Sequence, residues 1–228
     1  MSARRPLLLL GAGGFARETA EVVRALEGVR PAWQLLGFCD DDPQLHGRRL
    51  EGISVLGGMD LAAEHPDAAL AVCTGSPGNY FSRARIVARL GLPAQRYATL
   101  VHPAASVARS AALGPGTVVL AGAVLTAAVT LGAHVAVMPQ VVLTHDTRVD
   151  DYATLAGGVQ LAGGAQVAEG AYLGAGALVR EGRRIGRGSL VGMGSLVTRD
   201  VPDLQVWYGR PARYQRDVDP LHLLEGAR

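Results

Sequence analysis

From Val107 to Pro202 the sequence repeats in units of six residues with no insertion between them. All sixteen units begin with Val, Leu or Ile. Only the unit that carries Arg183 has a fifth residue other than Ala, Val, Ser or Thr. A helix has a period of 3.6 residues and a strand alternates every two, so neither produces a clean period of six over 96 residues. The pattern is typical of a stacked-repeat fold.

The hexad predicts a solenoid in which each unit forms one flat side. The aliphatic residue points inward, a small residue fits the crowded corner, and glycine permits the turn. Three sides make a coil of 18 residues, so residues 18 apart stack, and at about 4.8 Å per coil the prism is roughly 25 Å long. A β-sandwich would not keep this phase. The repeat resembles the left-handed parallel β-helix of the hexapeptide-repeat acyltransferases, which we expect over residues 103–202.

The first hundred residues follow a different pattern, in which apolar runs alternate with amphipathic ones. Residues 5–26 read as a strand, a Gly-rich turn and a helix, and residues 33–42 as a second strand that ends in acids. Residues 68–75 read as a third strand and residues 76–92 as a second helix. This order predicts a Rossmann-like α/β domain with a parallel sheet over residues 1–102. Ligands of such sheets bind at the carboxyl ends of the strands, where Gly11, Gly13, Gly14, Asp40, Asp41 and Gly75 fall.

Two predictions concern the domain boundary and the segment that follows the repeat. The domain boundary is expected near residues 100–106, where His102 precedes Pro103 in a turn. After Pro202 the chain leaves the repeat, and residues 203–228 are expected to form a turn and a tail that includes a short capping helix. Trp207 and Tyr208 are expected to cap the prism rather than stack on a ligand.

The composition excludes several classes of function. The net charge is +2 and the basic residues are scattered, which argues against a nucleic-acid partner. All 22 cationic residues are Arg, so Schiff-base chemistry and a Walker-type phosphate loop, both of which need Lys, are excluded. Cys39 and Cys73 lack metal-ligand spacing and are expected to be reduced thiols. Because no segment approaches a membrane span or a signal peptide, we expect a cytoplasmic protein with no membrane partner.

A second resemblance covers essentially the whole chain. The segments GAGGFARE, FCDDD and AVCTG, followed by a hexapeptide domain, resemble the nucleotide-sugar N-acetyltransferases and sialic-acid O-acetyltransferase-like proteins of bacterial glycan synthesis. The resemblance implies that the N-terminal domain holds a UDP-linked sugar, with the Gly turn by the phosphates and the paired acids at the uracil. The implied substrate-binding residues are Gly13, Gly14, Phe15, Asp40, Asp41 and Gly75. The family often has His in place of Phe15.

Within the repeat, the segment THDT places His145 and Asp146 side by side. His145 is the third residue of its hexad, near a coil edge, and the residues 18 before and after it are Ala127 and Gly163. A His flanked by small residues leaves room for two substrates. Acyl transfer from a thioester needs a base for the acceptor's proton, and imidazole suits that role near neutral pH. Since adjacent residues on a strand point to opposite faces, Asp146 can orient the ring only if the chain turns there.

The resemblance assigns roles around this pair. His145 is implied as the general base, Asp146 as its partner, and the Gly163 backbone N–H as the donor to the acetyl carbonyl. Acetyl-CoA is implied in the groove between subunits of a homotrimer, near Ala175 and Met193. Two positions depart from the family pattern. Met138 stands where relatives tend to have Asn, and Thr154 where many have a second His. These departures leave open an altered acceptor or a reduced activity.

The remaining polar residues of the repeat carry less information. We expect His134 to be a surface residue on a coil. We expect a solvated basic face, with contact to CoA phosphates as the alternative, from Arg180, Arg183, Arg184 and Arg187. With only two histidines in the prism, eleven residues apart, a zinc enzyme of the β-helix type is disfavoured and no metal is expected.

The favoured function is acetyl-CoA-dependent N-acetylation of a nucleotide-linked amino sugar. O-acetylation of a sugar hydroxyl is the nearest alternative, because the same base would act on a different atom. A trimeric scaffold that binds a nucleotide sugar without turnover also remains open. The segment GAGGFA formally fits the dinucleotide fingerprint G-x-G-x-x-A, but an NAD-dependent oxidoreductase would leave the prism unexplained.

Overall fold

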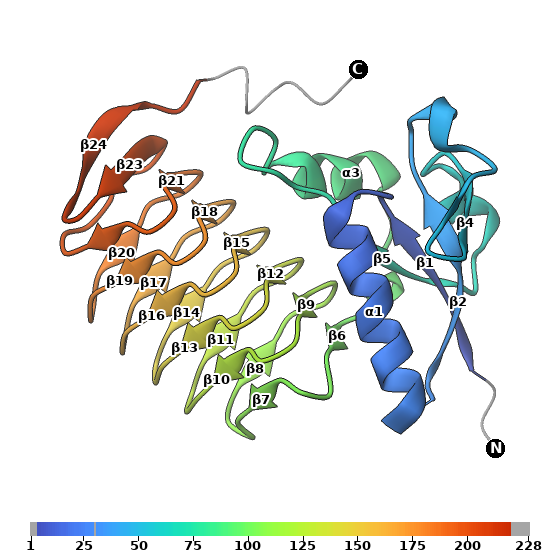
Figure 1. Ribbon diagram of the computed structural model, residues 1–228, viewed down its shortest axis with the longest axis horizontal. Coiled ribbons are helices and arrows are strands. Elements are labelled where there is room, and N and C mark those ends of the chain that lie inside the picture. The colour runs from blue at the N-terminus through green and yellow to red at the C-terminus, as the bar shows by residue number, and fades with distance from the viewer. Residues whose placement is uncertain (1–3, 30, 220–228) are drawn as a thin grey trace.

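The computed structural model describes residues 4–29 and 31–219, which form an α/β unit lying beside a long prism of stacked coils (Figure 1). The two units meet where α3, Ser82–Leu90, and the loop before it contact the prism. This arrangement confirms the predicted fold class, a Rossmann-like parallel sheet followed by a left-handed β-helix. None of the described helices is long and apolar enough to cross a membrane.

The α/β unit is built around β1, whose four leucines at positions 7–10 are fully buried. The sheet order is β3-β4-β2-β1-β5, with β2 and β5 parallel to β1 on either side. The hairpin of β3 and β4 was not predicted from the sequence. The strands are β1 Arg5–Leu10, β2 Trp33–Cys39, β3 Arg49–Leu50, β4 Ile53–Gly57 and β5 Ala69–Val72. The helices are α1 Gly14–Val29, α2 Leu61–Glu64 and α3 Ser82–Leu90, with short 3-10 turns at Pro43–Leu45 and Ala94–Arg96.

The prism consists of two-residue strands joined by tight corners, and strands pair 18 residues apart, as Val142 does with Gln160. This register confirms the 18-residue coil. One side holds β7 Ser106–Val107, β10 Val124–Leu125, β13 Val142–Leu143, β16 Gln160–Leu161, β19 Leu178–Val179 and β22 Leu196–Val197. The second holds β8 Ala112–Leu113, β11 Thr130–Leu131, β14 Arg148–Val149, β17 Gln166–Val167 and β20 Arg184–Ile185. The third holds β6 Leu100–Val101, β9 Val118–Val119, β12 Ala136–Val137, β15 Thr154–Leu155, β18 Tyr172–Leu173 and β21 Leu190–Val191.

The prism has three corners, one after each side. The His145 corner follows the strands of the first side, the His134 corner those of the second, and the Met193 corner those of the third. At every corner the fourth residue of the hexad has a positive φ angle, from Gly116 to Gly194. Most of these residues are Gly, but five successive hexads carry a side chain there: Ala128, His134, Gln140, Asp146 and Tyr152.

The prism core has the composition that the hexad predicts. The first residues of the hexads from Val119 to Val197 are buried side by side along the axis. The small fifth residues fill the corners, and buried hydroxyls among them bond to nearby carbonyls. Thr147 Oγ1, for example, donates to the Thr144 carbonyl at 2.7 Å. Thr117 Oγ1 and Ser189 Oγ instead donate to carbonyls of the following coil, those of Gly132 and Pro202, so these buried hydroxyls are all paired within the prism.

The prediction of a capping helix after the repeat is wrong for the described residues. Residues 205–217 form the antiparallel hairpin of β23 Gln205–Gly209 and β24 Ala212–Asp217, not a helix. β23 pairs with β21, so the hairpin covers the open edge of the last coil, which would otherwise expose unpaired backbone groups. Trp207 packs on the prism core as expected of a cap, whereas Tyr208 is exposed. The rest of the predicted helix, residues 220–228, lies outside the described residues.

Candidate active site

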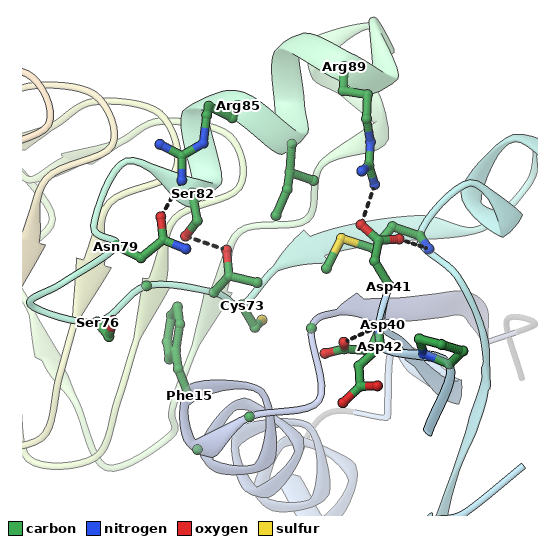
Figure 2. A pocket seen from close by; sticks show the side chains of 18 residues that line it. Phe15, Asp40, Asp41, Asp42, Cys73, Ser76, Asn79, Ser82, Arg85 and Arg89 are labelled. Carbon is green, nitrogen blue, oxygen red and sulfur yellow. Dashed lines mark hydrogen bonds and ion pairs between the residues drawn. The ribbon is translucent and has the colours of Figure 1, made fainter. Parts of the chain in front are cut away.

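A cavity of about 820 Å³ opens at the carboxyl ends of β1, β2 and β5 (Figure 2). β2 and β5 lie on opposite sides of β1, so the cavity sits at the switch point where such sheets bind ligands. All six residues proposed from the sequence as substrate-binding line it: Gly13, Gly14, Phe15, Asp40, Asp41 and Gly75. The structure therefore brings together residues that follow three different strands.

The Gly-rich turn forms one wall of the cavity. Gly11 has a φ of +109°, and a Cβ there would lie 2.8 Å from Thr74 Cγ2 and 2.9 Å from the Cys73 carbonyl. Only Gly allows the turn to approach the loop after β5 so closely. Gly13 and Gly14, by contrast, face open space. Because α1 begins at Gly14, its first N–H groups and positive dipole end meet the cavity, which favours a phosphate or another anion.

The two acids have different partners. Asp40 Oδ2 accepts from Ala12 N at 2.8 Å and its Oδ1 accepts from Asp42 N at 3.0 Å, so this carboxylate holds the Gly turn against the end of β2. Asp41 Oδ1 accepts from Met59 N at 2.9 Å, and its Oδ2 pairs with Arg89 Nη2 at 2.8 Å. Asp40 is thus mainly a support for the turn, while Asp41 presents a carboxylate–guanidinium pair to the cavity.

Sequence reasoning missed the opposite wall, which comes from α3 and the loop before it. That wall adds Thr74, Ser76, Asn79, Ser82, Arg85 and Arg89. Figure 2 shows Arg85 bonded to Asn79 on one side and Arg89 to Asp41 on the other. Ser82, Arg85 and Arg89 are three and four residues apart, which is the spacing of one helix face. This spacing of polar residues is the sequence signal that could have indicated a polar face of α3 at the cavity.

At the His145 corner, the chain turns within the segment THDT. Asp146 has a φ of +60°, and this left-handed conformation returns its carboxylate to the preceding side chain. His145 Nδ1 and Asp146 Oδ2 lie 2.8 Å apart. The backbone of the corner is fixed from both neighbouring coils, because Asp146 N donates to the Ala127 carbonyl and Gly164 N donates to the His145 carbonyl. The ring orientation thus follows from a rigid corner and one side-chain bond.

The other nitrogen of the ring lies over Gly163. A Cβ at Gly163 would lie 2.5 Å from both His145 Cε1 and Nε2, so the ring occupies the place of the missing side chain. Both members of the pair are open to solvent, with side-chain exposures of 68% for His145 and 69% for Asp146. Among the described residues, no carbonyl accepts from the Gly163 N–H. An exposed imidazole therefore stands beside an uncommitted backbone donor, which is the pair of groups that acyl transfer requires.

Ala175 and Met193 lie on a different corner from His145 and Gly163. They follow β18 and β21 on the Met193 corner, and Met193 is 77% exposed. Within one chain, the structure therefore does not bring the four residues into a single site. A groove that contains all of them needs two corners from different chains.

His134 was predicted to be on the surface, and this prediction is wrong. Only 3% of the residue is exposed, because the α/β unit covers its corner. Its ring stacks on Tyr152 at 5.2 Å between centroids and meets the edge of Tyr97 at 4.6 Å. Burial, reinforced by the nearby Arg83, lowers the pKa of His134 to about 4. The sequence could not reveal which corner the other domain covers.

The two departures from the family pattern also lie at the junction of the domains. Met138 packs against the core of the α/β unit. Thr154 is 7% exposed, and its Oγ1 accepts from Arg83 Nη2 at 2.7 Å. Both side chains are therefore used in joining the two units.

The basic cluster of the repeat forms ion pairs. The pairs are Arg180–Glu181, Arg183–Asp200, Arg184–Asp203 and Arg187–Glu169, at 3.0 to 3.6 Å. The backbone N–H of Arg187, together with Arg184, lowers the pKa of Asp203. Within residues 4–29 and 31–219 there is no group of three or more His, Cys, Asp or Glu side chains arranged to hold a metal ion.

Comparison with known proteins agrees with this architecture. Residues 6–90 match the family model described as the PglD N-terminal domain. The acetyltransferase domain of PglB from Neisseria gonorrhoeae is 30% identical to the chain, with a TM-score of 0.82. The match covers 93% of this chain and 100% of that domain. The chain belongs to the nucleotide-sugar N-acetyltransferase family of hexapeptide-repeat proteins, and it is an acyltransferase.

Two further members of the family have similar structures. PerB from Caulobacter crescentus, solved with CoA and GDP-perosamine, is 28% identical with a TM-score of 0.82, over 94% of this chain and 99% of PerB. WeeI from Acinetobacter baumannii is 25% identical with a TM-score of 0.79, over 92% of this chain and 99% of WeeI. A search of curated proteins gives no match.

Proposed function

We propose that this acyltransferase transfers the acetyl group of acetyl-CoA to the amine of a nucleotide-linked sugar, with His145 as the general base. The observation that carries the proposal is the corner where His145 Nδ1 meets Asp146 Oδ2 at 2.8 Å while the opposite ring edge lies over Gly163. The cavity of the α/β unit is the proposed site of the nucleotide sugar, and CoA in the PerB structure supports the choice of acyl donor.

The reaction can be written with these atoms. The amine nitrogen of the sugar attacks the thioester carbonyl while His145 Nε2 removes a proton from that amine. The carbonyl oxygen becomes an oxyanion. The Gly163 N–H donates to that oxyanion, which stabilises the tetrahedral intermediate. The Asp146 carboxylate stabilises the imidazolium that has formed. The C–S bond then breaks, the CoA thiolate leaves and takes the proton from the His145 imidazolium, and the product is an N-acetyl sugar.

The proposed active site is shared between chains of a homotrimer. In one chain the cavity is lined by residues 11–89, and the α/β unit contacts the His134 corner rather than the His145 corner. An acceptor held in the cavity is therefore proposed to reach the His145 of a neighbouring copy. In the same assembly, the Met193 corner of one prism would face the His145 corner of the next, and acetyl-CoA would lie between them.

The nearest alternative is O-acetylation of a sugar hydroxyl, since the same base can deprotonate either acceptor. A binding scaffold without turnover is the third candidate. The structure of PerB contains GDP-perosamine, so a GDP-linked acceptor competes with the UDP-linked acceptor expected from the sequence. These candidates differ in the atom acetylated and in the nucleotide, so a panel of acceptors separates them.

The first experiment measures release of free CoA thiol from acetyl-CoA with UDP-, GDP- and dTDP-linked amino sugars, for the wild type and for His145→Ala. Turnover with one amino sugar that falls by a factor of about 10² to 10⁴ in the variant supports the proposal. Turnover that survives in His145→Ala refutes His145 as the base. Activity only with hydroxyl acceptors supports O-acetylation, and binding without turnover supports the scaffold.

A second experiment tests the shared site. Gly13→Trp would fill the cavity, because Gly13 faces open space, and His145→Ala would remove the base. Each variant alone is expected to be inactive. Co-expressed chains should form mixed trimers in which an intact cavity meets an intact His145 from another chain, and activity should return. Mixed trimers without activity would place both parts of the site in one chain.

A further inference from the structure

Arg83, the second residue of α3, is a buried cation at the junction between the two units. Only 1% of the residue is exposed, and no carboxylate in the described part of the chain pairs with it. All its acceptors are neutral oxygens: the carbonyls of Thr74, Tyr152, Ala153 and His134, and Thr154 Oγ1. Burying an arginine without a counter-ion is costly, and burial lowers the pKa of Arg83 to about 10.

These bonds join the rim of the cavity, formed by Thr74 and Gly75 after β5, to the prism. Nη1 donates to the Thr74 carbonyl at 2.8 Å, and Thr74 lines the cavity. Nε donates to the His134 carbonyl at 3.0 Å and Nη2 to the Tyr152 carbonyl at 2.7 Å, in two successive coils of the His134 corner. One planar group therefore fixes three segments that are far apart in the sequence.

Gly75 shows how closely the rim follows Arg83. A Cβ at Gly75 would lie 2.7 Å from Arg83 Nη1, so the guanidinium stands where the side chain is missing. Thr74 Oγ1 and Ser82 Oγ also lie 2.9 Å apart, which ties the same loop to the first turn of α3. Three residues before Arg83, Tyr80 Oη donates to the Gly188 carbonyl at 3.0 Å. The loop thus has its position set by the prism as well as by its own sheet.

We propose that Arg83 is a positioning residue for the acetyltransferase. It holds the Thr74–Gly75 rim at a fixed position along the axis of the prism. The rim in turn sets the direction in which the sugar of the bound nucleotide extends out of the cavity toward the base. This inference rests on the proposed function of the cavity. Lys cannot substitute, because its ammonium is a single donor centre, whereas the planar fork of Arg serves acceptors on three segments at once.

The test compares Arg83→Lys with Arg96→Lys. Arg96 is a matched control: it too donates to carbonyls of the α/β unit, those of Ala62, His65 and Ala68, but unlike Thr74 none of these three residues lines the cavity. Both variants are expected to lower the melting temperature. Only Arg83→Lys is expected to raise KM for the nucleotide sugar by about tenfold and to lower kcat by up to about 10²-fold, as a misplacement near 1 Å does. Its KM for acetyl-CoA should stay within about twofold of the wild type.

The outcomes separate this inference from the proposed function. If the wild type turns over no nucleotide sugar, the proposed function fails first. If it is active and Arg83→Lys keeps both KM values and kcat while losing only stability, as Arg96→Lys does, Arg83 is merely structural and the proposal is overturned. Should Arg83→Lys not fold, Thr154→Val removes a single acceptor of Arg83. A KM for the nucleotide sugar raised about threefold in Thr154→Val supports the proposal, and an unchanged KM overturns it.

Discussion

Gly163→Ala tests the proposed chemistry with the smallest change that the structure offers. The new methyl group would lie 2.5 Å from His145 Cε1 and Nε2, whereas an ordinary contact needs at least 3.4 Å. The ring therefore has to move by about 1 Å, and its 2.8 Å bond to Asp146 cannot survive that shift unchanged. A misplacement of this size typically lowers the rate by about 10²-fold.

The same substitution should leave the fold intact. Gly163 does not have a left-handed backbone, so Ala is compatible with its conformation. The ring it displaces is largely exposed and free to swing into solvent. Replacing a Gly whose conformation suits Ala stabilises a protein by roughly 0.4–1 kcal/mol, because the unfolded chain has less freedom to lose. We expect a free energy of unfolding equal to or slightly above that of the wild type, measured by urea titration.

The assay is acetyl-CoA turnover with the preferred acceptor, for four proteins: wild type, Gly163→Ala, His145→Ala and the double variant. In His145→Ala the methyl group has no ring to displace, so the double variant should lose no more activity than His145→Ala alone. Full activity in Gly163→Ala would show that the position of the ring does not matter. An extra loss in the double variant would assign Gly163 a role independent of His145. Either result refutes the reasoning.

Three further predictions concern stability and reactivity. Asp146→Gly removes the strain of a side chain at a φ of +60° together with an exposed hydrogen bond, so it should raise the free energy of unfolding by about 0.5 kcal/mol while kcat falls by about tenfold or more. A stabilised but fully active variant would exclude a role for Asp146. Because the pKa of His134 is about 4 in the folded state, against 6.5 for an ordinary histidine, the unfolded chain gains this proton first as the pH falls. Stability should therefore decline from pH 6.5 to pH 4 by up to about 3 kcal/mol, and His134→Asn should flatten that decline in urea titrations at several pH values. Burial raises the pKa of Cys39 to about 11 and of Cys73 to about 12, so an aromatic disulfide reagent at pH 8 should label both thiols in urea and neither in the native protein.

Several residues show why the site was only partly predictable. The six cavity residues were placed correctly at one sheet edge, because parallel strands bring their carboxyl ends together whatever the details of packing. The opposite wall was missed because the sequence of α3 does not say which of its faces meets the cavity. The pairing of Asp41 with Arg89 joins residues 48 apart, and no local pattern predicts it.

His134 and His145 show where prediction from sequence stops. Both lie in the same repeat, at adjacent hexad positions, and a single period describes them equally well. The period determined the prism, its 18-residue coil, the inward residues and the stacking of Gly163 on His145, because these depend only on local spacing and on the geometry of parallel pairing. Which corner is covered was decided by tertiary structure alone. The α/β unit docks through Arg83 and Tyr80 on the His134 corner, which buries that histidine and leaves His145 open to solvent. Burial by a second domain depends on contacts between distant segments. A repeat with the same pattern on all three sides gives no information about those contacts.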